Sequence, residues 1–231
     1  MEEFVDALLF YVAFLFSVTL HEAGHAWAAL RGGDSTAYLG GQVSIDPLPH
    51  IRREPVGMVV LPIVTVLMTG WPFGYASAPY NPAWARRHPR RAAWMALAGP
   101  GANLLLLILT VVLIRLGLEM GVLAAPDSVN LTRVVRSASE GASGVAYFLS
   151  ALFTMNLVLL LLNLLPIPPL DGAGAMPLLL SEEWAERYRV LCARPGFALF
   201  GMFLAWTFFG EILFPVFLFA VNLLYPGLHY G

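Results

Sequence analysis

Residues 4–30, FVDALLFYVAFLFSVTLHEAGHAWAAL, form a long apolar run that carries two histidines and a glutamate near its end. About 20 mainly apolar residues are enough for a helix to cross a lipid bilayer, so this run predicts a membrane-spanning helix. Charged side chains inside a bilayer cost about 2.5–3.5 kcal/mol each on insertion scales, and they usually have a function. The group HEAGH at 21–25 therefore indicates a functional site within the helix.

The composition of the whole chain is that of a membrane protein. Of its 231 residues, 58% are hydrophobic and 12% are charged, whereas soluble domains contain about 25% charged residues. The net charge of −2 gives no support for nucleic-acid binding. The single cysteine, Cys192, excludes an internal disulfide and a zinc site made only of cysteines. The acidic start, Met1-Glu2-Glu3, is unlike a secretory signal, so we expect the first apolar run to be retained.

Further apolar segments predict the rest of the membrane domain. Three of them reach the length of a spanning helix, at residues 92–118, 145–165 and 196–224. We therefore expect an all-α polytopic membrane protein of about four to five transmembrane helices, with a short re-entrant or strand-like element after the first. The chain is expected to be one domain, 1–231, with its core in 4–172 and a C-terminal membrane segment at 196–224.

Three segments have less decisive patterns. Residues 38–45 lie in a glycine-rich stretch with some alternation, which predicts a loop or short strands. The stretch 129–135 is amphipathic and suggests a short helix on the membrane surface, with its apolar side formed by Val129, Leu131, Val134 and Val135. The segment 196–224 is either one tilted helix or a hairpin of two, because Gly210-Glu211 lies near its middle. Glu211 is a functional candidate in the first case and a hairpin tip in the second.

The group HEAGH fits the pattern H-E-x-x-H. On a helix, His21 and His25 lie one turn apart on the same face, so both imidazoles can reach one metal ion. Glu22 projects about 100° around the helix, where it can hold a water molecule without binding the metal. Zinc suits this set, and a catalytic zinc site has three protein ligands and one open position. The alternative is a chance match, but this composition gives only roughly 0.005 expected matches.

Asp171, in the stretch NLLPIPPLDG at 163–172, is the best candidate for the third ligand. The prolines of this stretch cannot continue a regular helix, and they can turn the Asp171 carboxylate back into the bundle. The alternative is that Asp171 and Gly172 form an ordinary turn. The histidines and Asp171 all come late in or after their helices, so those two helices must run in parallel. Only one segment between them can then cross the membrane. We expect the short run 56–71, which contains Pro62, to be a re-entrant or surface-dipping element.

The distribution of arginines supports this topology. With one crossing between the two helices, residues 31–91 and 166–195 share a side that holds ten arginines, and the opposite loop holds two. If 56–71 also crossed, the arginines would divide five against seven. Because basic residues collect on the cytoplasmic side, the first arrangement is favoured, and it places the site toward the cytoplasm.

Three motifs in this order resemble the site-2 protease family of intramembrane zinc metalloproteases: HEAGH, GPGAN at 99–103 and NLLPIPPLDG. The resemblance extends over most of the chain and is to the compact form without PDZ or other regulatory domains. It implies that His21, His25 and Asp171 bind one Zn²⁺ and that Glu22 is the catalytic base and then acid. Asn103 matches a family asparagine that positions substrate or stabilises the reacting carbonyl. From the residues alone, Asn103 can equally be a contact between helices.

The resemblance implies hydrolysis of a peptide bond within or near a transmembrane segment of a membrane-anchored protein or peptide. The alternatives are a non-proteolytic membrane zinc-binding or transport protein and a zinc hydrolase that acts on lipid. The protein is expected in the cell membrane, in contact with the lipid bilayer. Strands at 38–45 would let an extended substrate pair with the main chain. His50 is a weak candidate for a residue supporting the metal ligands.

Overall fold

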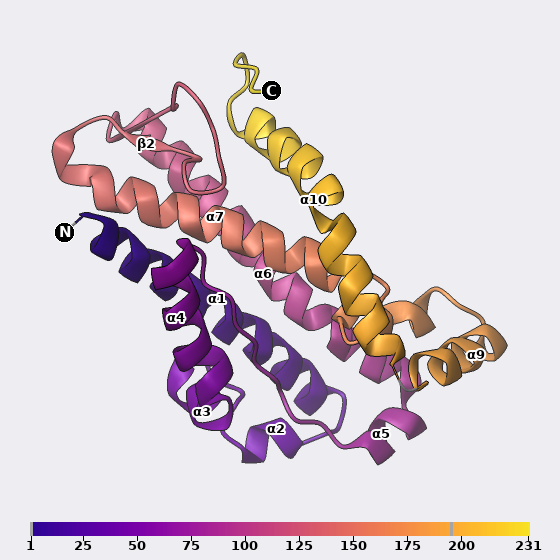
Figure 1. Ribbon diagram of the computed structural model, residues 1–231. Helices are drawn as coiled ribbons and strands as arrows, with labels where there is room; N and C mark the ends of the chain where they lie inside the picture. The colour runs from indigo at the N-terminus through magenta and orange to yellow at the C-terminus, as the bar shows by residue number, and fades with distance from the viewer. Residues whose placement is uncertain (1, 195) are drawn as a thin grey trace.

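The computed structural model describes residues 2–194 and 196–231, and long helices dominate it (Figure 1). Four of them are long and apolar enough to cross a membrane: α1 (Glu2–Arg31), α6 (Pro89–Glu119), α7 (Ser143–Asn163) and α10 (Phe197–Leu224). The prediction of an all-α polytopic membrane protein is confirmed. Helix α6 begins three residues earlier than the sequence predicts, at Pro89, because a proline in the first helical position needs no partner for an N–H.

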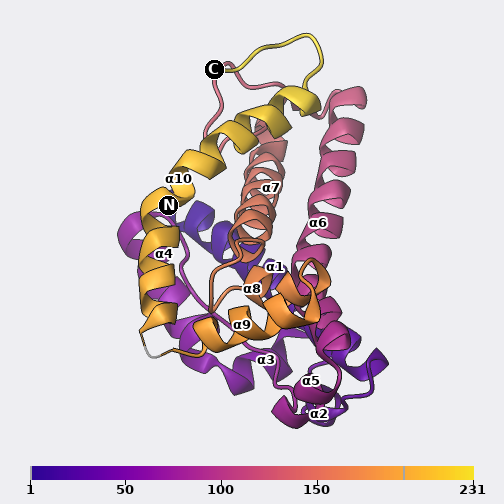
Figure 2. The ribbon, with the colours of Figure 1, turned by 90° about the vertical axis from the view of Figure 1, so that its right-hand side faces the viewer.

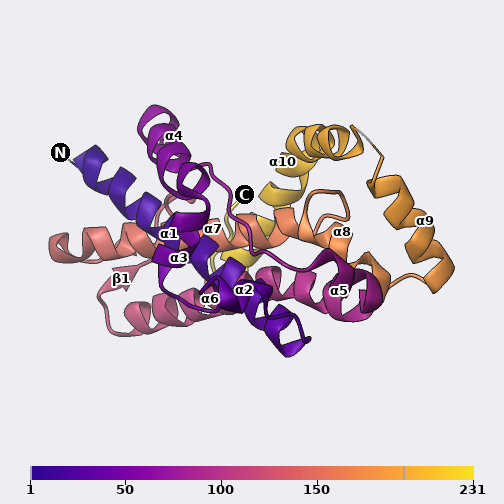
Figure 3. The same cartoon turned by 90° about the horizontal axis from the view of Figure 1, so that it is seen from below.

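Helices α1 and α7 run in the same direction, as the sequence predicts. Contacts between the two helices move toward the C-terminal end of both, from the ring pair Phe10–Tyr147 to the hydrogen bond between Ser17 and Asn156. Helix α6 runs the opposite way, since His25 near the end of α1 bonds to Met95 near the start of α6. Seen from two further directions, α1 and α7 lie between α6 on one face and α4 and α10 on the other (Figures 2 and 3).

The segment between α1 and α6 enters the bundle and returns to the end where it began. It contains α2 (Thr36–Leu39), α3 (Pro47–Arg53), the π-helical turn η1 (Val56–Val60) and α4 (Leu61–Thr69), and it leads to α5 (Pro82–Arg87). We call residues 56–80 the re-entrant hairpin. Its tip at Gly70 lies beside the first turns of α1, and its two limbs touch so closely that a Cβ on Gly57 would overlap Tyr75. The re-entrant prediction is therefore confirmed, and only α6 crosses between α1 and α7.

Of the two alternatives for 38–45, the strands are wrong, and a loop is confirmed for residues 40–45. Residues 36–39 form the helical turn α2, and the following residues form turns and bends. The cause is local: the carboxylate of Asp34 accepts hydrogen bonds from the backbone N–H and the hydroxyl of Thr36, which starts the helical turn. Gly41, with φ of +75°, then reverses the chain.

The surface helix predicted at 129–135 is also wrong. The connection instead contains an antiparallel pair of short strands, β1 (Leu123–Ala124) and β2 (Arg136–Ser137), followed by the 3₁₀ turn η2 (Glu140–Ala142). The side chain of Asn130 accepts two hydrogen bonds from Thr132 and closes a turn where the helix would have to continue. Val134 and Val135 are both buried, and their N–H groups donate to the hydroxyl of Ser150 in α7.

Helix α10 is one continuous helix, which resolves the two alternatives for 196–224. It begins after Gly196, whose φ is +81°, and keeps Pro215 inside it. Glu211 lies on the exposed side of this helix and does not line the cavity described below. The chain ends beside the connection between α6 and α7, because the hydroxyl of Tyr225 donates to Val134. Both described ends of the chain thus lie opposite the end that carries α2, α5 and α9 (Figure 1).

Candidate metal centre

The two histidines and the aspartate predicted as metal ligands converge on one point. The Nε2 atoms of His21 and His25 lie 3.0 Å apart. The Oδ2 atom of Asp171 lies 3.0 Å from the first and 3.2 Å from the second. Four ligands at about 2.0–2.1 Å from a tetrahedral zinc ion lie about 3.3 Å from one another. The three atoms therefore have the spacing and the chemical nature of a zinc site with an open fourth position.

Gly99 in α6 leaves the space that this cluster occupies. A Cβ atom on Gly99 would lie 2.7 Å from Nε2 of His21 and would overlap Nε2 of His25. Only glycine allows the α6 backbone to come this close to both imidazoles. The two histidines that Gly99 faces thus explain why the first position of the GPGAN stretch is a glycine.

Hydrogen bonds on the far side of each imidazole fix its orientation. The Nδ1–H of His25 donates to the carbonyl oxygen of Met95 (2.7 Å), and the Nδ1–H of His21 donates to Oδ1 of Asn103 (2.6 Å). Each imidazole therefore keeps the lone pair on Nε2 for a metal ion.

Asn103 is held in turn by two residues that the sequence analysis did not identify. Its amide donates to Oδ1 of Asn156 in α7 (2.9 Å) and to the carbonyl oxygen of Ser17 in α1 (3.2 Å). The amide of Asn156 donates to the hydroxyl of Ser17 (2.9 Å). All three residues are fully buried. Asn103 thus joins the three central helices and orients His21, while its contact with substrate stays a prediction.

Asp171 reaches the histidines because the chain folds back after α7. It opens the short helix α8 (Asp171–Ala175), which continues into the 3₁₀ turn η3 (Met176–Leu178) and then α9 (Glu182–Cys192). A Cβ on Gly172 would overlap the carbonyl oxygens of Leu164 and Leu165, so glycine is needed for this return. Asp-Gly is therefore more than an ordinary exposed turn here.

The carboxyl of Asp171 is in the form that binds a cation. Burial raises the pKa of the Asp171 carboxyl, but when His21 and His25 are protonated their Nε2–H groups donate to it, and these bonds with their positive charge lower the pKa well below its usual range. With zinc in the site, the charge of the metal would have the same effect on the carboxyl.

Glu22 faces the same cavity as the three candidate ligands. The cavity has a volume of about 480 Å³ and is bounded by α1, α6, the return limb of the re-entrant hairpin and the 168–174 segment. Glu22 is only 6% exposed. In the part of the chain that the structure describes, no group hydrogen-bonds to its carboxylate. His50 lies outside this cavity, where its Nε2 bonds to the carbonyl oxygen of Ser44.

Comparisons with known proteins identify the family. The sequence profile described as "Peptidase family M50" matches residues 9–208. The protein named "Putative zinc metalloprotease YwhC" of Bacillus subtilis (strain 168) is 32% identical over 166 residues, which cover 70% of this chain and 64% of that protein. The "Putative zinc metalloprotease Rip2" of Mycolicibacterium smegmatis is 30% identical over 178 residues, 76% of this chain and 59% of that protein. The protein of the same name in Mycobacterium tuberculosis (strain Erdman) is 34% identical over 185 residues, which cover 80% of this chain and 61% of that protein.

The chain spans 59–64% of the length of these curated relatives. No solved structure matches it significantly. The profile match contains HEAGH, GPGAN and NLLPIPPLDG, the motifs that supply the clustered residues. The chain therefore belongs to peptidase family M50, the site-2 protease family that its motifs resemble.

Proposed function

We propose that this protein is an intramembrane zinc metalloprotease that hydrolyses a peptide bond within or near a transmembrane segment of a membrane-anchored substrate. One observation carries the proposal: the ligand atoms of His21, His25 and Asp171 lie within 3.2 Å of one another beside Glu22, inside a bundle of spanning helices. A protease needs these groups around one cavity, and a carrier would instead need ionisable groups along a path through the membrane.

The chain's own residues would bind the metal and move the proton. When bound by the three ligands, zinc would polarise the scissile carbonyl and lower the pKa of a water molecule. The carboxylate of Glu22 would take a proton from that water and return it to the nitrogen of the leaving amine. Asn103 and the Met95 carbonyl would keep both imidazoles oriented during these steps.

At residues 76, 78 and 80 of the return limb, the part of the chain that the structure describes offers the backbone no hydrogen-bond partner, and we call residues 76–80 the free backbone edge. Backbone groups of odd-numbered residues in and directly after this limb bond to the protein: Tyr75 N donates to Gly57 O (3.1 Å), Ser77 O accepts from Gln42 Nε2 (3.2 Å) and Asn81 N donates to Asp34 Oδ2 (2.6 Å). Successive residues of an extended chain direct these groups to opposite edges. The even-numbered residues would therefore direct theirs the other way, beside the cavity that Ala76, Ser77, Ala78 and Tyr80 line.

An extended substrate could pair with this edge as an added strand. Such pairing suits an unwound segment of a membrane helix, because a regular helix keeps its carbonyls in internal hydrogen bonds. The role expected of residues 38–45 would therefore fall to residues 76–80, with Gln42 supporting them from behind.

We expect Ala78→Pro to lower the cleavage rate about fivefold, because proline removes one N–H from the free edge and one hydrogen bond contributes about 0.5–1.5 kcal/mol. Because Pro79 follows this position, residue 78 already favours an extended backbone, which a proline can also adopt. The zinc content should not change. The matched control Ala78→Ser keeps the N–H and should cleave at the wild-type rate, whereas an unaffected rate in Ala78→Pro would rule out pairing at this residue.

The direct test of the proposed function is cleavage by the purified protein in lipid vesicles. We expect it to cut a single-spanning test peptide, to stop when zinc is removed by a chelator, and to recover when about one equivalent of zinc is returned. Mass spectrometry of the products would locate the cut. A protein that hydrolyses vesicle lipids and leaves the peptide intact would be a lipid hydrolase and would refute the proposal.

We further propose that the site faces the cytoplasm from the cell membrane. Residues 31–91 and 166–195 together contain ten arginines. These two stretches join the spanning helices at the end of the bundle where α1 ends and α6 begins, next to the candidate metal ligands. Basic residues favour the cytoplasmic side. Labelling of cysteines placed at either end of the bundle in intact cells would test this orientation.

A further inference from the structure

We propose that a charged groove between α5–α6 and α9 binds an acidic segment of the substrate, next to the membrane on the cytoplasmic side. This inference rests on the proposed proteolytic function and adds a substrate preference to it. It is carried by three observations: cavities that continue from the active site to the surface, an excess of positive charge along them, and the direction of the free backbone edge.

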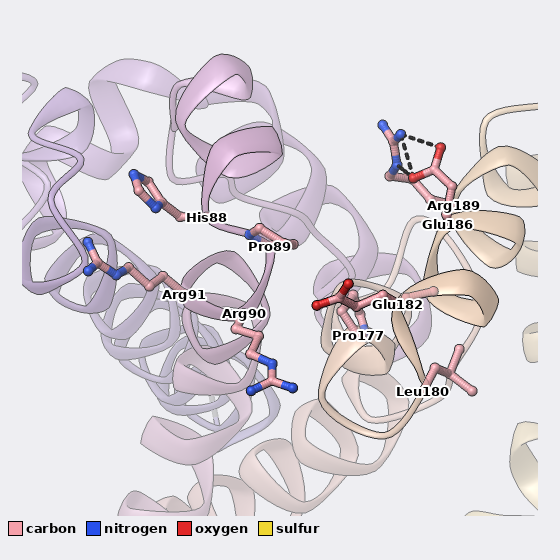
Figure 4. A pocket seen from close by; sticks show the side chains of 10 residues that line it. His88, Pro89, Arg90, Arg91, Pro177, Leu180, Glu182, Glu186 and Arg189 are labelled. Carbon is pink, nitrogen blue, oxygen red and sulfur yellow. Dashed lines mark hydrogen bonds and ion pairs between the residues drawn. The ribbon is translucent and has the colours of Figure 1, made fainter.

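Three cavities follow one another from Glu22 to the surface. The site cavity shares several lining residues with a second cavity of about 510 Å³, namely Tyr80, Ala85, Ala92, Ala173 and Gly174. The second cavity shares residues with a third of about 540 Å³, namely Pro89, Pro177, Ala185, Glu186 and Arg189. We call the second and third cavities together the α9 groove. It opens where α6 begins and α9 lies across from it (Figures 2 and 4).

The α9 groove has more unpaired positive than negative charge. Arg86 lines its inner part, and Arg90 and Arg91 line its outer part. On the opposite wall Glu186 and Arg189 form an ion pair at 2.6 Å, so their charges cancel, and Glu182 adds one negative charge (Figure 4). The guanidinium of Arg91 also donates to the carbonyl oxygen of Gly32. Among the arginines that line the groove, Arg86 and Arg90 are therefore the two for which the described structure shows no hydrogen bond or ion pair.

The free backbone edge leads into this groove. Ala76 and Ala78 line the site cavity, and Tyr80, the next even-numbered residue, lines both the site cavity and the inner part of the α9 groove. A polypeptide that pairs with the edge and continues past Tyr80 would therefore pass Arg86 and then Arg90. This continuity favours a peptide over a lipid headgroup as the occupant, and positive charge favours an acidic one.

The experiment measures binding and cleavage separately, in vesicles of neutral phosphatidylcholine. Binding is measured with the Glu22→Gln protein and two fluorescent single-spanning peptides that differ only in the cytoplasmic flank, which carries four glutamates or four glutamines. We expect the acidic peptide to bind about fivefold more tightly, as two exposed charge pairs allow. The preference should shrink in high salt, which screens exposed charges.

Charge reversal identifies the surface responsible. In Arg86→Glu/Arg90→Glu the acidic peptide should lose its advantage, and a peptide with a four-lysine flank should gain affinity, which a misfolded protein could not produce. Arg52→Glu is the matched control, because Arg52 is exposed and lines none of the three cavities. Its preference should be that of the parent protein.

Other outcomes separate the groove from the proposed function. Equal binding of the acidic and neutral peptides would overturn the groove proposal, even if the wild-type protein cleaves both. A preference for the acidic peptide in a protein that cleaves neither would support the groove and count against the protease. If the charge reversal changes only the affinity for vesicles that contain anionic lipid, the arginines bind lipid headgroups and the groove proposal is wrong.

Discussion

Replacing Glu22 by glutamine should abolish peptide cleavage and leave the zinc content unchanged. Glutamine has the same size and reaches the same cavity, but it cannot accept a proton from water at neutral pH. General base and acid catalysis contribute about 10²–10⁴-fold to a rate, so we expect a loss of about three orders of magnitude. Glu22 is not one of the three residues whose ligand atoms cluster, so the Glu22→Gln protein should still bind the metal. The measurements are zinc per chain by elemental analysis and product formation in the same samples.

Glu211→Gln is the matched control for this prediction. Glu211 is also a glutamate on a spanning helix, but it lies on the exposed side of α10 and away from the cavity. We expect its variant to cleave at the wild-type rate. If Glu22→Gln cleaves normally, another group takes the proton and the assigned role of Glu22 is wrong. If it loses zinc as well, Glu22 binds or orients the metal.

The sequence was sufficient where one strong physical constraint acted on many residues. The thickness of a bilayer sets the length of the four apolar segments. Because His25 lies late in its segment and Asp171 directly after its own, the two ligands can meet only if α1 and α7 are parallel. That requirement also predicted the re-entrant hairpin, because a second crossing would separate the ligands. The structure agrees, with Asp171 lying 3.2 Å from His25 across 146 positions of sequence.

The short segments between the helices were harder to predict because single side-chain bonds decide them. At 36–39 the carboxylate of Asp34 starts a helical turn in a stretch whose alternation suggests a strand. At 129–135 the amide of Asn130 closes a turn in a stretch whose spacing suggests a helix. Both side chains compete with regular structure for backbone partners, and sequence periodicity cannot detect that competition.

Support for the metal ligands was partly visible in the sequence. Asn156 is an amide in the middle of a very apolar helix, which is an expensive position and a signal of a function. Ser17 precedes His21 by one helical turn and so faces the same side. The free edge at 76–80 had no such signal, because small residues in an irregular stretch show nothing of which backbone groups remain unpaired.

Replacing Asp171 by alanine should remove zinc and cleavage together. Residues that only orient metal ligands contribute about 10–100-fold to metal affinity, so loss of a direct ligand should weaken binding by more than about 100-fold. The remaining His21 and His25 would offer two ligands where a catalytic zinc site uses three. Asp127→Ala is the matched control, since Asp127 is an exposed aspartate at the opposite end of the bundle. Zinc retained at one per chain in Asp171→Ala would show that another group is the third ligand, although α1 and α7 would still be parallel. Zinc lost from Asp171→Ala and kept in Glu22→Gln would separate binding from proton transfer within the same cavity, which is the division of roles that the geometry requires.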